Sequence, residues 1–162
     1  MSSEIFLHLT GVEGESLHEG HEGQIEIREW SWSISNGAPF AMKEEKKSSA
    51  VVVERITIEK IFDKASVTLA GFCTSGDHIS DGLITCYKGA GDSRMPYLKI
   101  KLNDVMVKKI NWPSKGEHEI NNETVELDFA SFEIIYKVQT NTGLAAKGSV
   151  HTKFDLQKHS EK

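Results

Sequence analysis

The chain has 162 residues, of which 38% are hydrophobic, and its formal net charge at pH 7 is −5. That length fits a single domain over residues 1–162, and the negative charge argues against a protein that binds a nucleic-acid backbone or an anionic membrane surface. No apolar run approaches the roughly 18 residues that a membrane-spanning helix needs. The N-terminal segment MSSEIFLHLT lacks the basic and apolar regions of a cleaved signal peptide, so we expect a soluble protein made in the cytoplasm.

Alternation of apolar and polar residues dominates the chain and predicts strands with one buried face. One helix is expected over 63–74, where Asp63 is a good N-cap and Gly76 can end the helix. A polar, Gly-rich stretch follows the first strand at 11–23. In chain order, the expected strands lie over 4–10, 24–35, 51–60, 79–88, 98–107, 125–136 and 148–156.

Three of these strands change the parity of their apolar residues midway, across 28–29, 103–104 and 130–131. Because a slip of one residue turns every later side chain to the opposite face, a bulge at each point would keep both apolar sets inside. Strands that bend in this way curl a sheet. We therefore predict a mainly β fold, a curled or closed antiparallel β-barrel with one short α-helix on its side.

The connection over 36–50 is longer than the usual few residues between strands. It contains the apolar pair Phe40 and Met42 and a charged block made of Lys43, Glu44, Glu45, Lys46 and Lys47. One interpretation is a solvated hairpin, and the other is an arm that becomes ordered against another subunit. The polar tail over 157–162 is expected to fray.

The most tempting chemical cluster is the segment His18-Glu19-Gly20-His21-Glu22. Its histidines lie three residues apart, and its glycines disfavour the helix on which a zinc protease holds its ligands. We interpret the segment as a solvated turn, and we interpret His78 as hydrogen-bonded to nearby backbone. No G-x-S-x-G motif is present. The sequence therefore predicts no enzyme activity, no metal site and no cofactor.

Four segments carry a family resemblance. They are GVEGES at 11–16, the triplet Trp30-Ser31-Trp32, IFDKASVTLAGFCTSGDH at 61–78 and ETVELDFASFEIIY at 123–136. In order and spacing they resemble the Hcp (hemolysin-coregulated protein) family of bacterial type VI secretion systems. Two features depart from that pattern. Lys153-Phe154-Asp155 stands where the family often has Gly-Trp-Asn or Gly-Trp-Asp, and the connection after Gly37 is charged rather than Gly-rich. These departures bear on contacts between rings and on cargo preference more than on the fold.

The resemblance implies a structural subunit that forms a hexameric ring with an open centre, and rings that stack into a tube inside a contractile sheath. Its partners would be further copies of itself, secreted effectors held in the ring lumen, and the sheath and spike or baseplate components. Nucleic acid and membrane are not expected partners. The protein would leave the bacterial cytoplasm through the secretion machine without a cleaved signal peptide. A phage-like tail-tube subunit and a monomeric β-barrel ligand-binding module remain alternatives, and the second would need a concave pocket lined by aromatic residues.

The resemblance also suggests roles for individual residues. Alternation places both indoles of the Trp-Ser-Trp triplet on one face, so Ser31 and Ser33 are expected to face the lumen and touch cargo, unless they are ordinary exposed serines. A cyclic ring joins two different patches. Phe6, Val52 and Ile135 are the expected interface residues, unless they fill a two-sided core. The charged block of the connection is the candidate for ring stacking, which exposed ion pairs would make weak and salt-sensitive.

Overall fold

The computed structural model describes residues 4–41, 50–89, 94–113, 122–139, 145–158 and 160–161, and within them strands predominate beside one helix, α2. The predicted mainly β fold is confirmed. None of the helical segments that the structure describes is long and apolar enough to cross a membrane. The elements are β1 Ile5–Leu9, β2 Ile25–Ile27, β3 Glu29–Ser31, β4 Ile34–Asn36, β5 Val51–Val53, β6 Ile56–Lys60, α2 Lys64–Ser75, β7 Ile79–Lys88, β8 Met95–Asn111, β9 Glu123–Gln139, β10 Ala145–Asp155 and β11 Ser160–Glu161.

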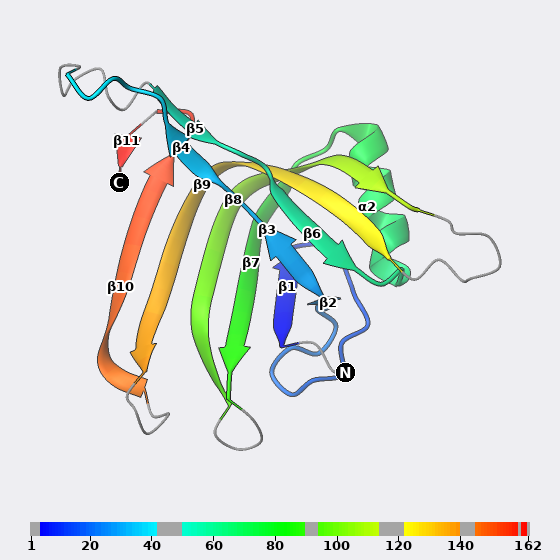
Figure 1. The fold of residues 1–162 in the computed structure, drawn as a ribbon. Helices are drawn as coiled ribbons and strands as arrows, with labels where there is room; N and C mark the ends of the chain where they lie inside the picture. The colour runs from blue at the N-terminus through cyan, green and yellow to red at the C-terminus, as the bar shows by residue number, and fades with distance from the viewer. Residues whose placement is uncertain are drawn as a thin grey trace.

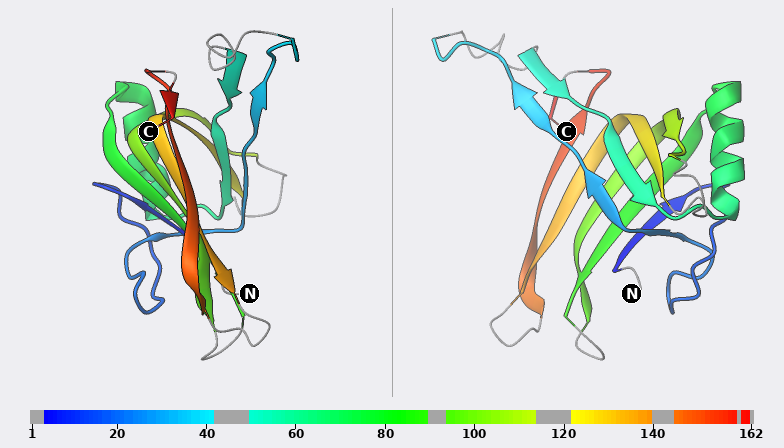
Figure 2. Two further views of the ribbon diagram at one scale, coloured as in Figure 1. Left: turned by 90° about the vertical axis from the view of Figure 1, so that its left-hand side faces the viewer. Right: turned by 45° about the vertical axis from the view of Figure 1, so that its right-hand side comes forward.

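One antiparallel sheet contains most of the strands, in the order β11-β10-β9-β8-β7-β1-β2, and β6 pairs with both β3 and β9. The chain leaves β2 and enters β3 at Arg28, whose backbone N–H donates to the carbonyl of Glu59 at 2.9 Å. Residues 25–31 are therefore bonded to β1 at one end and to β6 at the other, which brings the sheet back on itself. The result is a curled half-barrel (Figure 1), whose two layers face each other when seen from the side (Figure 2).

The long strands β8 and β9 bend together at one point. Leu102 pairs with Phe132 and Val105 pairs with Phe129, and all four side chains are buried although each strand has changed parity between them. The register is the same on both sides of this point, and Asp104 has a positive φ of 56°. The predicted parity changes are confirmed, but the predicted bulge is wrong here, because two matched kinks turn both strands at once. The register shifts lie elsewhere, between Cys86 and Tyr87 of β7 in its pairing with β8, and between Val107 and Lys109 of β8 in its pairing with β9.

The two long strands expected over 24–35 and 51–60 are divided in the structure. The first forms β2, β3 and β4, and the second forms β5 and β6. The parity change at 28–29 coincides with the exchange of strand partner from β1 to β6 rather than with a bulge.

The helix α2 begins and ends where the sequence predicts. The Asp63 side chain accepts a hydrogen bond from the backbone N–H of Ser66, and the Ser66 hydroxyl accepts one from the backbone N–H of Asp63. At the other end Gly76 has a φ of 74° and donates its N–H to the carbonyl of Phe72. Both caps satisfy backbone groups that a helix leaves unpaired at its ends. Its face with Ala65 and Leu69 is buried.

The strands β4 and β5 form a separate two-stranded sheet, with Ile34 opposite Val53 and Asn36 opposite Val51. We call the described residues 34–41 and 50–53 the arm, and the arm projects away from the curled sheet in each ribbon view (Figures 1 and 2). The tail also differs from expectation, because 160–161 pair with Phe154 and Asp155 as β11 instead of fraying.

Candidate functional site: surfaces for assembly and cargo

The N-terminal loop over 11–24 folds back over the outer face of β1 and covers Phe6. The ring of His21 stacks on the ring of Phe6 with centroids 4.3 Å apart and 4° between planes, and Tyr87 meets Phe6 edge-on at 5.9 Å. Phe6 is fully buried by these contacts. The residue expected at a subunit interface therefore has no exposed area to offer a neighbour, and it packs within its own chain.

His21 is buried, so the prediction of a solvated turn is wrong for this residue. Its Nδ1 lies 2.8 Å from Oε1 of Gln24, and its Nε2 is hydrogen-bonded to the hydroxyl of Tyr87. These bonds occupy both ring nitrogens. Within the described ranges, no group of three His, Cys, Asp or Glu residues is placed to hold a metal ion.

The GVEGES motif at 11–16 fixes the same loop. A Cβ on Gly14 would lie 2.4 Å from the carbonyl oxygen of Gln24, so the two segments approach too closely for any side chain there. Glu15 reaches the helix, where its Oε2 accepts the backbone N–H of Lys64 at 3.1 Å. The motif thus joins the loop to the first turn of α2.

A buried ionic cluster holds the start of α2 against the sheet. Lys60 on β6 and Glu123 on β9 are both fully buried, and Nζ of Lys60 lies 2.6 Å from Oε2 of Glu123. Nζ also donates to Oδ1 of Asp63 at 2.8 Å and to Oγ of Ser66 at 2.9 Å. The second carboxylate oxygen of Glu123 accepts Nε1–H of Trp112 at 2.9 Å. Each charge therefore has close partners of opposite charge or matching polarity.

Sequence reasoning missed this cluster, although a signal for it was present. Lys60 has the same parity as Ile56 and Ile58, and Glu123 has the same parity as Val125 and Leu127. Two opposite charges at inward positions of two strands indicate a buried pair. The alternation alone could not show that the strands are neighbours.

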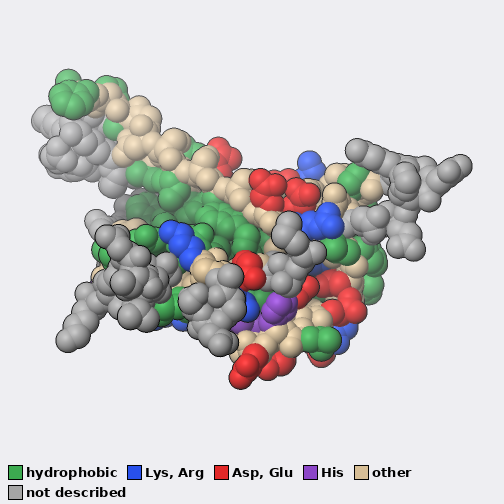
Figure 3. Space-filling view, turned by 60° about the horizontal axis from the view of Figure 1, so that its bottom comes forward, with side chains coloured by type: hydrophobic (Ala, Val, Ile, Leu, Met, Phe, Trp, Pro, Cys, Tyr) green, Lys and Arg blue, Asp and Glu red, His purple; other side chains and the backbone are tan. Residues whose placement is uncertain are grey.

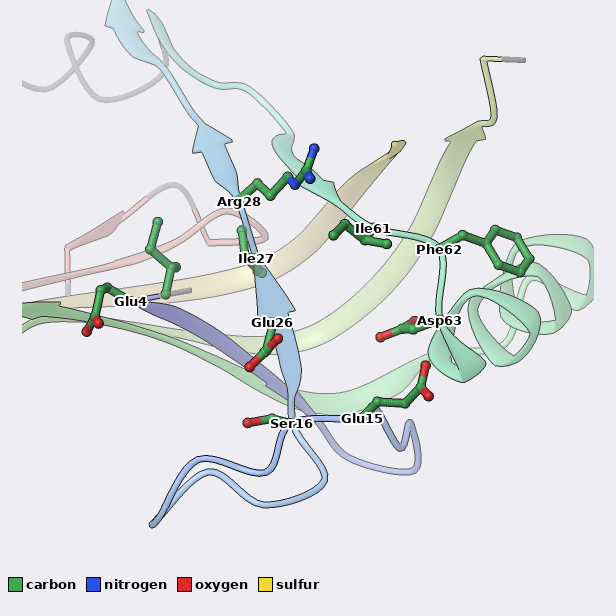
Figure 4. A pocket seen from close by; sticks show the side chains of 10 residues that line it. Glu4, Glu15, Ser16, Glu26, Ile27, Arg28, Ile61, Phe62 and Asp63 are labelled. Carbon is green, nitrogen blue, oxygen red and sulfur yellow. The ribbon is translucent and has the colours of Figure 1, made fainter. Parts of the chain in front are cut away.

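An open pocket of about 780 Å³ lies between the N-terminal loop, β2 and the segment before α2 (Figure 4). Carboxylates dominate its polar lining, together with Arg28, and the segment before α2 supplies Ile61 and Phe62. Among the described lining residues Phe62 is the one aromatic side chain, which does not fit the aromatic-lined pocket expected of a ligand-binding barrel. The acidic lining residues are Glu4, Glu15, Glu26 and Asp63.

Several other titratable side chains lie apart from one another in the fold. Burial raises the pKa of the Cys86 thiol inside the curled sheet. Hydrogen bonds from Thr10 and Ser80 hold the pKa of Asp81 below its usual range at the exposed end of β7. His78 is bonded to the carboxylate of Asp104 rather than to backbone, which corrects the expectation for it. In the described part of the chain these groups are elements of local packing, and they do not converge on one reacting position.

The expected cargo residues lie on the outer surface of the layer to which β3 and β6 belong. Ser31 is exposed on β3, opposite Thr57 of β6. Ser33 is exposed too, and its carbonyl accepts the backbone N–H of Glu54 at 3.0 Å. The two indoles beside Ser31 turn inward and pack against the core, where they are partly buried, and Nε1 of Trp32 donates to the Glu54 carbonyl at 2.8 Å.

The remaining interface candidates lie far apart in the chain. Val52 is 51% exposed on the arm, opposite Ser35, and Ile34 and Phe40 of the arm are exposed too. Ile135 is half-buried on the outer face of β9, between Lys99 of β8 and His151 of β10. The charged block from Lys43 to Lys47 lies outside the described residues.

A view from the lower side of the molecule shows hydrophobic side chains in the hollow beneath the arm, while acidic side chains gather near the histidines (Figure 3). On the inner face of β9 and β10, Tyr136, Val138 and Val150 are partly exposed. The part of the sheet that carries them is not covered by β3 and β6, which pair with other positions.

Comparison with known proteins places this fold. The family model described as "Type VI secretion system effector, Hcp" matches residues 6–136. Protein hcp1 of Pseudomonas aeruginosa is 27% identical over 159 residues, which cover 98% of each chain. The crystal structure of Hcp1 from Salmonella typhimurium superposes with a TM-score of 0.78 at 27% identity, over 100% of both chains. A type six secretion system protein at 21% identity has a TM-score of 0.86, covering 99% of this chain and 100% of its own. Because the family model matches residues 6–136, which are most of this chain, the chain belongs to the Hcp family of type VI secretion system proteins.

Proposed function

We propose that this chain is a structural subunit of the type VI secretion inner tube, that it forms hexameric rings which stack, and that the rings carry effectors in their lumen. Membership of the family supports the tube role. The protein would then reach its destination through the secretion machine itself, in contact with sheath and spike or baseplate components.

The observation that carries the proposal is the arm. An isolated two-stranded hairpin is marginally stable in water, because it has no second layer on which to bury its side chains. In the described residues the arm pairs Ile34–Asn36 with Val51–Val53, and it exposes Ile34, Phe40 and Val52. An element with this composition gains stability by packing on another copy. The arm is therefore the first part of the proposed contact between subunits.

A ring brings together two different patches, repeated once for each subunit. In the proposal the arm with Val52 belongs to one patch, and Ile135 on the sheet face belongs to another surface available for assembly. The charged block from Lys43 to Lys47 is proposed to contact the next ring. Exposed ion pairs contribute about 0–1 kcal/mol each, so stacking of free rings should be weak and should weaken further with salt.

Native mass spectrometry of the purified protein, combined with negative-stain imaging, tests the ring. We expect particles of six subunits with a central hole. A monomer that persists across a wide range of concentrations would contradict the tube role for this chain.

The lumen assignment needs its own experiment. The tagged chain is co-expressed with each effector of its own secretion system, and the effector that co-purifies is measured. Ser31→Gln places a longer side chain on the proposed lumen surface and should reduce the recovered effector while rings still form. Unchanged recovery would contradict the assignment of Ser31 and Ser33.

A further inference from the structure

A row of side chains begins at Ser31 and crosses β3, β6, β9 and β8 on the outer surface of the curled sheet. Ser31 of β3 is directly opposite Thr57 of β6, and Thr57 is directly opposite Glu126 of β9. Glu126 is in turn opposite Lys109 of β8. Strands are about 4.8 Å apart, so the row spans roughly 14 Å. Side chains that are directly opposite share one face of a sheet.

The adjacent row establishes which face this is. Trp30, Ile58, Val125 and Ile110 are also opposite one another, one position along the same strands. Ile58 and Val125 are fully or almost fully buried, and the other two pack against the core. Because neighbouring positions on a strand point to opposite faces, the Ser31 row points away from the core.

The chemistry of the row is polar along its whole length. Ser31 and Thr57 offer two hydroxyl groups that can each donate and accept a hydrogen bond. Glu126 lies between two cations, with Nη1 of Arg55 at 3.6 Å and Nζ of Lys109 at 3.9 Å. The two cationic side chains are 44% and 65% exposed, whereas Glu126 is 29% exposed, so within this row the charges most available to a partner are positive.

We infer that this row is one contact surface for cargo, in which Thr57 and Glu126 act beside Ser31 to decide which effector is retained. The inference rests on the proposed function, since it extends the lumen assignment of Ser31. An unbroken line of hydroxyls and exposed ion pairs fits the polar surface of a folded protein that presents carboxylates to Arg55 and Lys109. It does not fit an unfolded apolar segment, because the row offers no apolar side chain to bury it.

The probe is the effector whose recovery falls in the Ser31→Gln experiment. Thr57→Gln should lower its recovery about tenfold, in the same range as Ser31→Gln, because each removes a hydroxyl contact and fills the surface. Thr57→Ser keeps the hydroxyl and should retain wild-type recovery. Ser149→Gln is the matched control, since Ser149 is an exposed strand serine on β10, opposite Lys137 and outside the row. Ring formation and thermal unfolding of each variant establish that it folds.

Salt provides the test of the charged end. Recovery of the effector should fall as salt is raised from low to high concentration, because exposed charges are screened. Glu126→Gln leaves Arg55 and Lys109 without their internal partner, so it should increase retention at low salt and steepen the salt dependence.

The outcomes distinguish the inference about the row from the proposal that Ser31 faces the lumen. If Ser31→Gln lowers recovery and Thr57→Gln does not, the row is wrong while the lumen assignment stands. If neither variant lowers recovery of any effector, the lumen assignment itself is wrong. If Ser149→Gln lowers recovery as much as Thr57→Gln, contact is not confined to the row and the inference is overturned.

Discussion

Lys60 and Glu123 are buried side by side, and the ammonium of Lys60 donates a hydrogen bond to the carboxylate of Glu123. Taking two charges out of water is costly, and the cost is recovered only where the pair has good geometry and further hydrogen bonds. Here the ammonium has two other side-chain acceptors, in Asp63 and Ser66, and the carboxylate also accepts from Trp112. The pair therefore ties β6, β9 and the start of α2 at one point.

Removing one member should be far more costly than removing both. Lys60→Met leaves the Glu123 carboxylate buried without its cation, so we expect a loss of about 3–5 kcal/mol in the free energy of unfolding. Lys60→Met combined with Glu123→Leu should lose less free energy of unfolding than Lys60→Met alone, and therefore less than the two single changes added together. Urea denaturation of the three variants measures both quantities.

Lys64 supplies the control, because its Nζ lies 3.1 Å from Oε1 of Glu13 in an exposed pair. Lys64→Met should cost less than about 1 kcal/mol. Equal losses for the buried and the exposed lysine, or strict additivity in the double variant, would mean that the cluster does not act as a unit.

At the residue scale, alternation predicted the inward faces of most strands, because burial of one face is a local property of the pattern. It did not predict the burial of Phe6 or His21. Phe6 has outward parity on β1 and is buried only because a loop from later in the chain covers it. That cover depends on aromatic stacking between residues 15 positions apart in sequence, and alternation within one strand contains no information about it.

At the scale of elements, the helix and the N-terminal loop are joined by the Glu15 contact, and a glycine in each gives opposite predictions. Gly14→Ala would place its Cβ against the backbone of Gln24, so the loop must move and we expect a loss of about 1–3 kcal/mol. Gly71→Ala lies within α2 and meets no atom within 4 Å. There the substitution should raise the free energy of unfolding by about 0.5–1 kcal/mol, because alanine restricts the unfolded chain more than glycine.

Thermal unfolding of both variants beside the native chain tests whether Gly14→Ala lowers the stability and Gly71→Ala raises it. A neutral Gly14→Ala would mean that the loop can shift without loss, and the close approach at the GVEGES motif would then have no energetic consequence. A destabilising Gly71→Ala would contradict the open surroundings of that position.

The helix could be predicted from sequence because its caps and its apolar stripe are local signals. The division of the expected strands could not. The chain from β2 to β4 changes partner from β1 to β6 and then to β5, and each change depends on strands that are distant in sequence. The joint kink of β8 and β9 was visible only as a parity change, because a bulge and a pair of matched kinks leave the same pattern in sequence.

At the scale of the whole molecule, the described residues include several groups of exposed apolar side chains, and two of them lie at the end of the molecule away from α2. The arm exposes Ile34, Phe40 and Val52, and the inner face of β9 and β10 exposes Tyr136, Val138 and Val150. Larger groups of exposed apolar side chains usually mark contact surfaces. In the proposed ring every subunit presents two different patches, and the arm is the exposed apolar group that the proposal assigns to one of them.

The contribution of the arm can be separated from general surface effects with a pair of exposed valines. Val52 is 51% exposed on β5 of the arm, and Val67 is 68% exposed on α2. Val52→Asp would place a carboxylate inside the proposed contact, so ring formation should weaken by roughly a hundredfold or more in protein concentration. Val67→Asp adds the same charge outside the proposed contact and should leave the rings intact.

Native mass spectrometry over a dilution series gives the ring population, and urea denaturation of the monomer checks that folding is preserved. Because Val52→Asp could unfold the arm itself, Val52→Thr keeps the β-branched shape and should retain most of the assembly. Rings of Val52→Asp that survive dilution like the native rings would show that assembly does not depend on the arm.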